Sequence, residues 1–201
     1  MPGEIDLSEA DPFVVTKGTE ETGGEFVQFE ATVYPPPDAD ADPADLDLPH
    51  EPWGADNGEE HVHPKQAEWF EVLAGEFRVA YGDVERTLSE GEEVTLPRGV
   101  PHTHWNPTDA PARVRWERRP ARQSEAWLET AYVLAQAGET GPDGTPGLLQ
   151  TAVTFDEYPD DTYLTRLPVG LQKAAVTVLA PVGRLAGYEA HRSRDELDDD
   201  L

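Results

Sequence analysis

The sequence predicts a β-barrel or β-sandwich followed by a helical extension, and three observations support this fold class. Residues 61–119 form a succession of short segments rich in Val, Phe, Trp and Thr, divided by Gly and Pro turns at close spacing. Residues 23–34 alternate apolar and polar side chains, which is the period of a half-buried strand. After Pro120 the apolar residues recur at helical spacing. Many short strands with Gly and Pro turns are typical of a sandwich or barrel.

The expected elements of the first part are a tail, a strand, a loop and the barrel strands. Residues 1–12 are expected to be a flexible tail, and the barrel domain is placed at 13–120. The strand within 23–34 carries its apolar residues on one parity. Residues 35–53 are rich in Pro and Asp and have no period, so we expect a long surface loop there.

Residues 121–201 are expected to form a helical extension that ends in an acidic tail. Small polar residues and glycine at the ends of the apolar runs indicate where the helices begin and end. The acidic run that closes the chain is expected to be solvated. The expected helices are 124–138, with Ser124 as N-cap and Gly138 as C-cap, 148–158, and 168–188, kinked at Pro181.

The chain is strongly acidic, with 41 Asp and Glu against 15 Lys and Arg and a formal net charge of −26. Such a surface repels phosphate backbones and anionic lipids, so neither nucleic acid nor a membrane is an expected partner. A dense carboxylate surface is also typical of proteins that work in concentrated salt, where self-repulsion is screened. We therefore expect a halophilic source, such as a halophilic archaeon, rather than an ordinary acidic protein of a mesophile.

Two absences narrow the chemistry and the location. The chain has no cysteine, which excludes disulfides, cysteine-ligated metal sites and a thiol nucleophile. The start, MPGEIDLSEADPF, lacks a basic stretch followed by an apolar one, so no signal peptide is expected. The most apolar segment, 167–188, is interrupted by polar residues and prolines and is not expected to span a membrane. These features favour a cytoplasmic protein.

His61 and His63 lie one residue apart on a predicted strand, and Glu68 follows five residues later. Side chains two apart on a strand point to the same face, so both imidazoles can reach one point. Taken alone, this pattern also fits a surface or core pair of histidines. Glu68 could likewise form an ion pair with Lys65 or Arg78.

A second stretch, GEEVTLPRGVPHTHWN at 91–106, favours a metal site over a surface or core pair of histidines. Together the two stretches resemble the paired motifs of the cupin superfamily, G(X)5HxH(X)3-4E(X)6G and G(X)5PxG(X)2H(X)3N. Every fixed position is present except the first glycine, where the chain has Ala55. The resemblance covers roughly residues 24–119 and leaves the C-terminal third unexplained. The matching residues are His61, His63, Glu68 and Gly75, then Gly91, Pro97, Gly99, His102 and Asn106.

The resemblance implies an all-β jelly-roll barrel, also called a double-stranded β-helix, that binds one divalent metal ion. Three imidazoles and one carboxylate suit Fe, Mn, Ni, Co or Zn and are too rich in nitrogen for Ca or Mg. An octahedral ion would keep two positions open for a substrate or dioxygen, whereas these ligands would close a tetrahedral zinc site. The identity of the metal stays open. The implied ligands are His61, His63, Glu68 and His102.

His104 shares the face of His102 if the strand is regular. It could donate a hydrogen bond to a ligand, transfer a proton near the metal, or stand inside the barrel in place of an aromatic residue, and it is not expected to be a fifth ligand. The same alternation predicts an apolar interior. The residues expected in this interior are Phe70, Val72, Phe77, Val79, Val94 and Leu96.

By resemblance, the leading hypothesis is a metal-dependent, dioxygenase-like oxidoreductase that acts on a small organic molecule. Glu68 and His104 are the candidate catalytic residues, with Glu68 as a proton acceptor if it leaves the metal when substrate binds. The alternatives are a non-redox isomerase or lyase acting on a small sugar or keto acid, and a non-catalytic small-molecule-binding module. A homodimer is expected, with the C-terminal helices covering the barrel or forming the interface.

Overall fold

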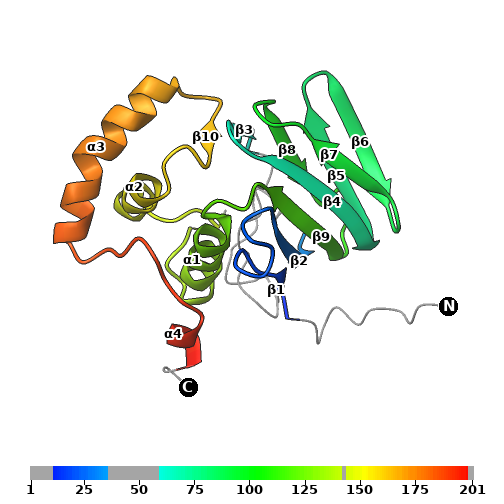
Figure 1. Cartoon of the computed structure of the whole chain (residues 1–201), viewed down its shortest axis with the longest axis horizontal. Coiled ribbons are helices and arrows are strands. Elements are labelled where there is room, and N and C mark those ends of the chain that lie inside the picture. The colour runs from blue at the N-terminus through cyan, green and yellow to red at the C-terminus, as the bar shows by residue number, and fades with distance from the viewer. Residues whose placement is uncertain (1–10, 36–58, 142–143, 199–201) are drawn as a thin grey trace.

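The computed structural model describes residues 11–35, 59–141 and 144–198. Within them, two five-stranded antiparallel sheets form a jelly-roll β-barrel, and the helices lie together on one side of it (Figure 1). Most of the predicted tail, almost all of the predicted Pro/Asp-rich loop and Ala55 fall outside the described residues. The predicted fold class, a barrel with a C-terminal helical extension, is confirmed.

The first sheet has the strand order β1-β2-β9-β4-β7 and the second has the order β10-β3-β8-β5-β6. The strands are β1 (Phe13–Lys17), β2 (Val27–Val33), β3 (His61–Val62), β4 (Ala67–Ala74), β5 (Glu76–Tyr81), β6 (Val84–Ser89), β7 (Glu93–Leu96), β8 (His102–Trp105), β9 (Ala112–Arg119) and β10 (Tyr163–Leu164). The helices are α1 (Ser124–Gln136), α2 (Leu148–Glu157), α3 (Val169–Leu185) and α4 (Asp195–Asp198).

The barrel interior follows the alternation read from the sequence. Successive side chains of a strand point to opposite faces, so one parity of each strand enters the core. All six residues predicted for the interior are buried, with Val72 and Val79 fully so. The predicted strand within 23–34 is β2, which places Val27 and Phe29 in the same core.

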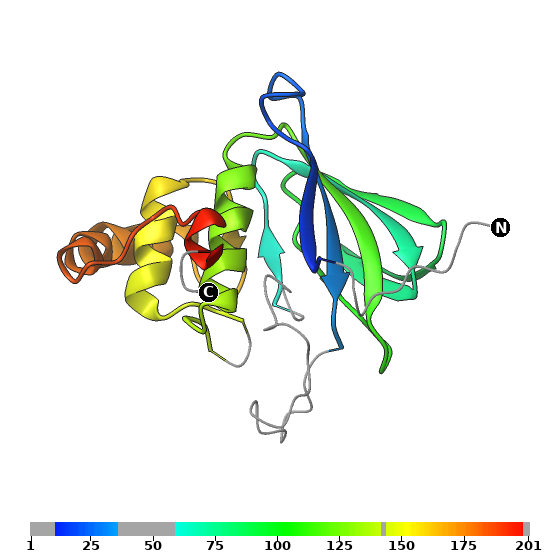
Figure 2. The ribbon, with the colours of Figure 1, turned by 90° about the horizontal axis from the view of Figure 1, so that it is seen from below.

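Helix α1 packs on the barrel, α2 packs next to α1, and α3 lies farthest from the barrel (Figure 2). Leu128 and Val133 of α1 belong to the barrel core, whereas Val153 of α2 and Ala180 of α3 form a small core of their own. The three predicted helices are present, and α3 continues through Pro181. None of the described helices is both long enough and apolar enough to cross a bilayer.

The end of the chain returns to the barrel, which the sequence did not predict. Strand β10 pairs antiparallel with β3, so the extension supplies the edge strand of the second sheet. The acidic tail is also not wholly solvated, because it begins with α4, whose Leu197 packs against the barrel core. Arg194 holds this turn in place by donating to the carbonyl oxygen of Phe13 at 2.7 Å.

Candidate metal centre

The four predicted ligands come together inside the barrel. His61 begins β3, His63 directly follows it, Glu68 lies on β4 and His102 begins β8. One ligand atom from each lies within 4.8 Å of all the others. Their exposed fractions are 1%, 1%, 1% and 3%, so water has little access to the group. The cross-strand pairing of His61 with His102 in the second sheet brings the two motifs together.

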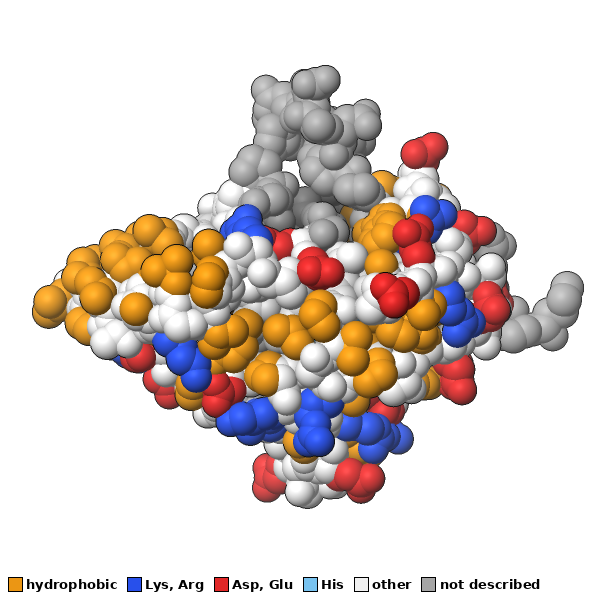
Figure 3. Space-filling view, turned by 90° about the horizontal axis from the view of Figure 1, so that it is seen from above, with side chains coloured by type: hydrophobic (Ala, Val, Ile, Leu, Met, Phe, Trp, Pro, Cys, Tyr) orange, Lys and Arg blue, Asp and Glu red, His pale blue; other side chains and the backbone are white. Residues whose placement is uncertain are grey.

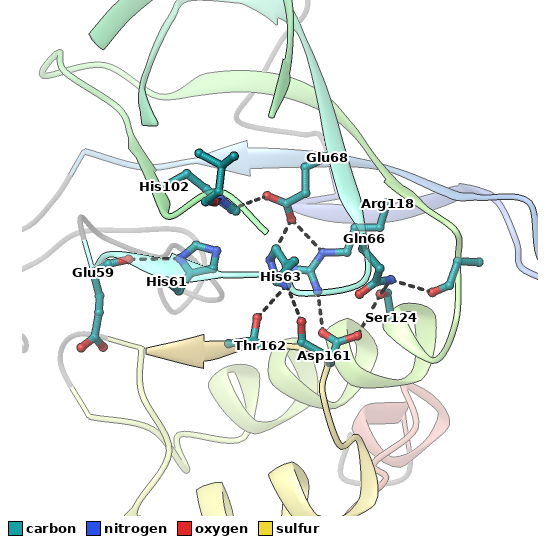
Figure 4. A network of polar contacts seen from close by, with 12 residues as sticks. Glu59, His61, His63, Gln66, Glu68, His102, Arg118, Ser124, Asp161 and Thr162 are labelled. Atoms are coloured by element: carbon teal, nitrogen blue, oxygen red, sulfur yellow. Dashed lines mark hydrogen bonds and ion pairs between the residues drawn. The ribbon is translucent and has the colours of Figure 1, made fainter. Parts of the chain in front are cut away.

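The three imidazoles are held in one tautomer by backbone carbonyl groups (Figure 4). A carbonyl oxygen can only accept a hydrogen bond, so each Nδ1 carries the proton and each Nε2 keeps its lone pair in the neutral ring. Thr162 Oγ1 also lies 2.8 Å from Nδ1 of His63. The Nδ1 contacts are His61 to the oxygen of Glu59 (3.1 Å), His63 to that of Asp161 (2.6 Å) and His102 to that of Val100 (2.8 Å).

The donor atoms fit a bound cation. Nε2 of His63 lies 3.2 Å from Glu68 Oε1, and Nε2 of His102 lies 3.0 Å from Glu68 Oε2. Two lone-pair atoms at such distances are stable only if a cation lies between them, either a proton or a metal ion. Adjacent donors bound at about 2.1 Å are about 3.0 to 3.4 Å apart at octahedral or tetrahedral angles. The residues present therefore fit a divalent ion in both donor chemistry and spacing.

Glu68 is ionised by its surroundings. Burial raises the pKa of Glu68, but its close contacts with His63, Arg118 and His102 outweigh burial and hold the pKa well below its ordinary value. The ion pairs considered from the sequence do not form, because Lys65 pairs with Asp160 and Arg78 pairs with Glu85. A carboxylate with a low pKa is a good metal ligand and a weak base.

His104 lies beside the four ligands rather than among them. Its ring centroid is 6.1 Å from that of His61, and only 5% of the residue is exposed. The rings of Phe70, Phe77 and Trp116 surround it at 5.1, 5.3 and 5.8 Å. His104 thus joins the metal site to an aromatic part of the barrel interior.

Other fixed residues of the motifs form turns. Gly75 has a φ of +78°, and a Cβ there would meet the backbone of Ala112 at 3.1 Å, so the position requires glycine. The side-chain amide of Asn106 donates to the carbonyl oxygens of Val33 and Ala110 at 2.9 and 2.7 Å. Gly75 follows the end of β4 and Asn106 follows the end of β8, whereas Glu68 and His102 lie near the starts of these strands, so these two residues fix loops at the other end of the barrel and make no contact with the ligand atoms.

Three residues at the site were missed by sequence reasoning, namely Arg118, Asp161 and Thr162. Arg118 faces Glu68 in the register of β9 and β4. The sequence could have indicated Arg118, because alternate residues of a strand share a face and Arg118 alternates with the apolar Val114 and Trp116. This pattern predicts an arginine that points into the barrel. Asp161 and Thr162 lie in a turn after α2, and nothing in their local pattern indicates a contact with His63.

The fold and the donor set define this chain as a jelly-roll barrel protein whose interior holds four buried donors that could bind a metal ion. Comparison with protein families then identifies the barrel. The family described as "Cupin domain" matches residues 51–116, which include both motifs and all four ligands. The part of the barrel that carries the four donors therefore matches a cupin domain, in agreement with the resemblance found in the sequence.

Similarity to individual proteins is short or distant. A segment of 46 residues is 46% identical to an oxidoreductase of the fungus Arthrobotrys oligospora; it covers 22% of this chain and 18% of that protein. A cupin-2 domain protein from Shewanella frigidimarina has 18% identity and a TM-score of 0.34, over 47% of this chain and 71% of the other. A cupin-superfamily sugar phosphate isomerase from Silicibacter pomeroyi has 18% identity and a TM-score of 0.38, over 61% and 68%. Likeness at this level does not define an activity.

Proposed function

We propose that the chain is a metal-dependent, dioxygenase-like oxidoreductase that acts on a small organic molecule. The observation that carries the proposal is the buried group of four donors beside the aromatic surroundings of His104. The buried rings of Phe70, Phe77 and Trp116 make the surroundings of His104 apolar, which suits a small enol, phenol or similar molecule. The fungal relative named an oxidoreductase agrees with this class, although the match spans less than a fifth of that protein.

The charges around the site favour this proposal over an isomerase or lyase that acts on a keto acid or another anionic substrate. An anionic substrate beside the metal would need a buried cation as its anchor. Among the described residues, the buried arginines are Arg113 and Arg118, and both already donate hydrogen bonds within the protein. A neutral or weakly acidic substrate needs no such anchor.

The roles of the residues follow from their positions. A redox-active divalent ion held by the three histidines and Glu68 would supply Lewis acidity and one-electron chemistry. Glu68 stays ionised opposite Arg118 and serves mainly as a ligand. His104 is then the better candidate to take a proton from a substrate hydroxyl, since it lies next to the ligands. Phe70 and Phe77 orient the substrate and exclude water.

The test combines elemental analysis of the purified protein with oxygen-uptake assays on a panel of enols, phenols and thiols, with each metal in turn. Oxygen uptake with Fe, Mn, Ni or Co supports the proposal. Turnover under strict anaerobiosis would assign the site to an isomerase or lyase instead. Substrate binding without turnover, unchanged by His63→Ala, would indicate a binding module.

A variant of His104 separates its role from those of the ligands. His104→Phe keeps a ring among the aromatic neighbours and removes both nitrogens. The expected result is unchanged metal content with a kcat lowered by about 10²–10⁴-fold, the usual contribution of a proton-transfer group. Unchanged turnover would make His104 a packing residue.

We also propose that two copies of the chain associate through α3. Residues 162–188 contain no Asp or Glu, although the whole chain has 41 of them. Figure 3 shows hydrophobic side chains gathered over α3. Leu171, Val178, Val182 and Leu185 are 56%, 67%, 50% and 90% exposed, and their spacing places them on one face of the helix. Because the net charge is −26, this apolar face is where two copies can meet with the least repulsion.

The acidic composition supports a further proposal about the environment. We propose a cytoplasmic protein of a halophilic organism, because a charge of −26 is well screened only in concentrated salt. The same screening favours association of two copies.

A further inference from the structure

A buried arginine connects the metal ligands to the C-terminal extension. Arg118 has an exposed fraction of 0%. Its Nε donates to Glu68 Oε1 at 2.9 Å, and its Nη1 donates to Asp161 Oδ2 at 3.0 Å (Figure 4). One guanidinium therefore spans from a barrel ligand to the turn between α2 and β10.

Aromatic rings fix the plane of this guanidinium. Its Cζ lies 4.8 Å from the ring centroid of Trp116 on β9 and 5.1 Å from that of Trp127 on α1. A planar, forked cation between two indoles can bind two carboxylates at once, which a lysine cannot reproduce. Nη2 has no hydrogen-bond partner among the described residues, so the two carboxylates and the rings account for its orientation.

Asp161 joins two of the metal ligands. Its backbone oxygen accepts from Nδ1 of His63 at 2.6 Å, while its side chain accepts from Arg118, which holds Glu68. Its other carboxylate oxygen accepts from Ser124 at the start of α1 at 3.3 Å, so Ser124 does not act as the predicted N-cap. Gln66 donates to Ser124 Oγ at 2.7 Å and completes the network.

We propose that Arg118 and Asp161 are positioning residues of the metal centre, and that the C-terminal extension is therefore part of this centre. The pair holds the Glu68 carboxylate in its ligating orientation, and Asp161 also sets the tautomer and the angle of His63. The inference rests on the metal site of the proposed function and not on the substrate or the reaction. This role explains why the extension, which lies outside the residues that match the cupin family, passes beside the ligands directly after its second helix.

The experiment measures Co(II) affinity and the Co(II) absorption spectrum of full-length variants, with thermal unfolding of the metal-free forms alongside. Asp161→Asn keeps the backbone oxygen and the shape but loses the charge, and Arg118→Lys keeps the charge but loses the fork. Loss of a group that hydrogen-bonds a ligand typically lowers metal affinity about 10–100-fold. We expect a loss of this size in both variants, with a changed spectrum. The matched control is Arg115→Lys, on the same strand, whose partners are Glu30 and Glu71 on the outer face.

A double variant distinguishes positioning from simple neutralisation of Asp161. If Arg118 only neutralises Asp161, Arg118→Met combined with Asp161→Asn should recover wild-type affinity, and that recovery would overturn the inference. Wild-type affinity and spectrum in Asp161→Asn and Arg118→Lys would overturn it as well. Weakened metal binding in these variants, together with no oxygen uptake in the wild-type protein, would retain the inference and reject the proposed function.

Discussion

Arg118 Nε lies 2.9 Å from Glu68 Oε1, and the two residues are directly paired across β9 and β4 with both side chains fully buried. Removing two charges from water costs several kcal/mol per ion, so a buried pair persists only where every charged group is engaged. Here Glu68 also faces His63 and His102, and Arg118 also binds Asp161. With neutral histidines, the cluster of Glu68, Asp161 and Arg118 carries one net negative charge. A bound divalent cation would make the net charge of this cluster positive.

Removal of the metal is expected to lower the melting temperature of the protein. A ligand present at 100 times its Kd stabilises the native state by about 2.7 kcal/mol. For a chain of this length, that corresponds to a Tm change of about 5 to 10 °C. Calorimetry before and after chelation, followed by metal readdition, measures the shift. In a His61→Ala variant the shift should vanish. A wild-type Tm that changes neither on chelation nor on metal readdition would contradict metal binding at this site.

The sequence was sufficient to predict that the four candidate ligands lie together and which side chains fill the barrel interior. His61, His63 and Glu68 lie within eight residues, and the fixed spacing to His102 carries the family motif. Alternation along a strand is a local property, so the burial of Phe70 and Val94 could be predicted without knowledge of strand pairing.

Contacts that depend on strand register, or on a distant segment folding back onto the barrel, could not be predicted from local alternation. Arg118 meets Glu68 only because β9 pairs with β4 in one particular register. Asp161 is 98 residues from His63, and no periodicity links a turn after α2 to the residue that follows β3. Strand β10 has two residues, which is too short to produce a recognisable period.

Two glycines of α3 should respond in opposite directions to the same substitution. A Cβ at Gly183 would lie 2.5 Å from Val153 Cγ2 and 2.9 Å from the carbonyl oxygen of Leu149, both on α2. Gly183→Ala should therefore destabilise by about 1–3 kcal/mol, the usual cost of overpacking, although alanine favours the helix by about 1 kcal/mol. Gly170→Ala has open space and should be neutral or stabilising. Urea unfolding measures both, and a stabilised Gly183→Ala would contradict the packing of α2 on α3.

Asp160 should contribute stability that disappears in acid. Its carboxylate accepts from Lys65 at 2.6 Å, from Lys173 at 3.0 Å and from the Tyr163 hydroxyl, and these hydrogen bonds lower its pKa. Because the folded pKa is below the unfolded value of about 3.9, the contribution is complete above about pH 5 and is lost as the pH falls through the folded pKa. Lys65 precedes β4 and Lys173 lies on α3, so the contacts tie the barrel to the extension.

The corresponding variant is Asp160→Asn, because asparagine tolerates the φ of +62° at this position. At neutral pH it should be less stable than the wild type by about 0.5–1 kcal/mol, the scale of partly exposed ion pairs. The difference should shrink as the pH falls below about 4. Urea unfolding at several pH values measures it, and a difference that stays constant into acid would assign it to something other than the charge.

The exposed face of α3 should control association of the chain. Val178 is 67% exposed near the middle of this face, so Val178→Glu places a charge where the second copy would pack without disturbing the monomer. Light scattering should give a dimer mass for the wild type and a monomer mass for the variant, with the same circular dichroism. Raising the salt from about 0.1 M to about 1 M shortens the screening length from about 10 to about 3 Å, so it should increase the dimer fraction of the wild type. The matched control is Val84→Glu on β6, which is 42% exposed and lies away from α3. A wild type that stays monomeric in high salt, or a Val178→Glu variant that remains dimeric, would show that this face does not join two copies.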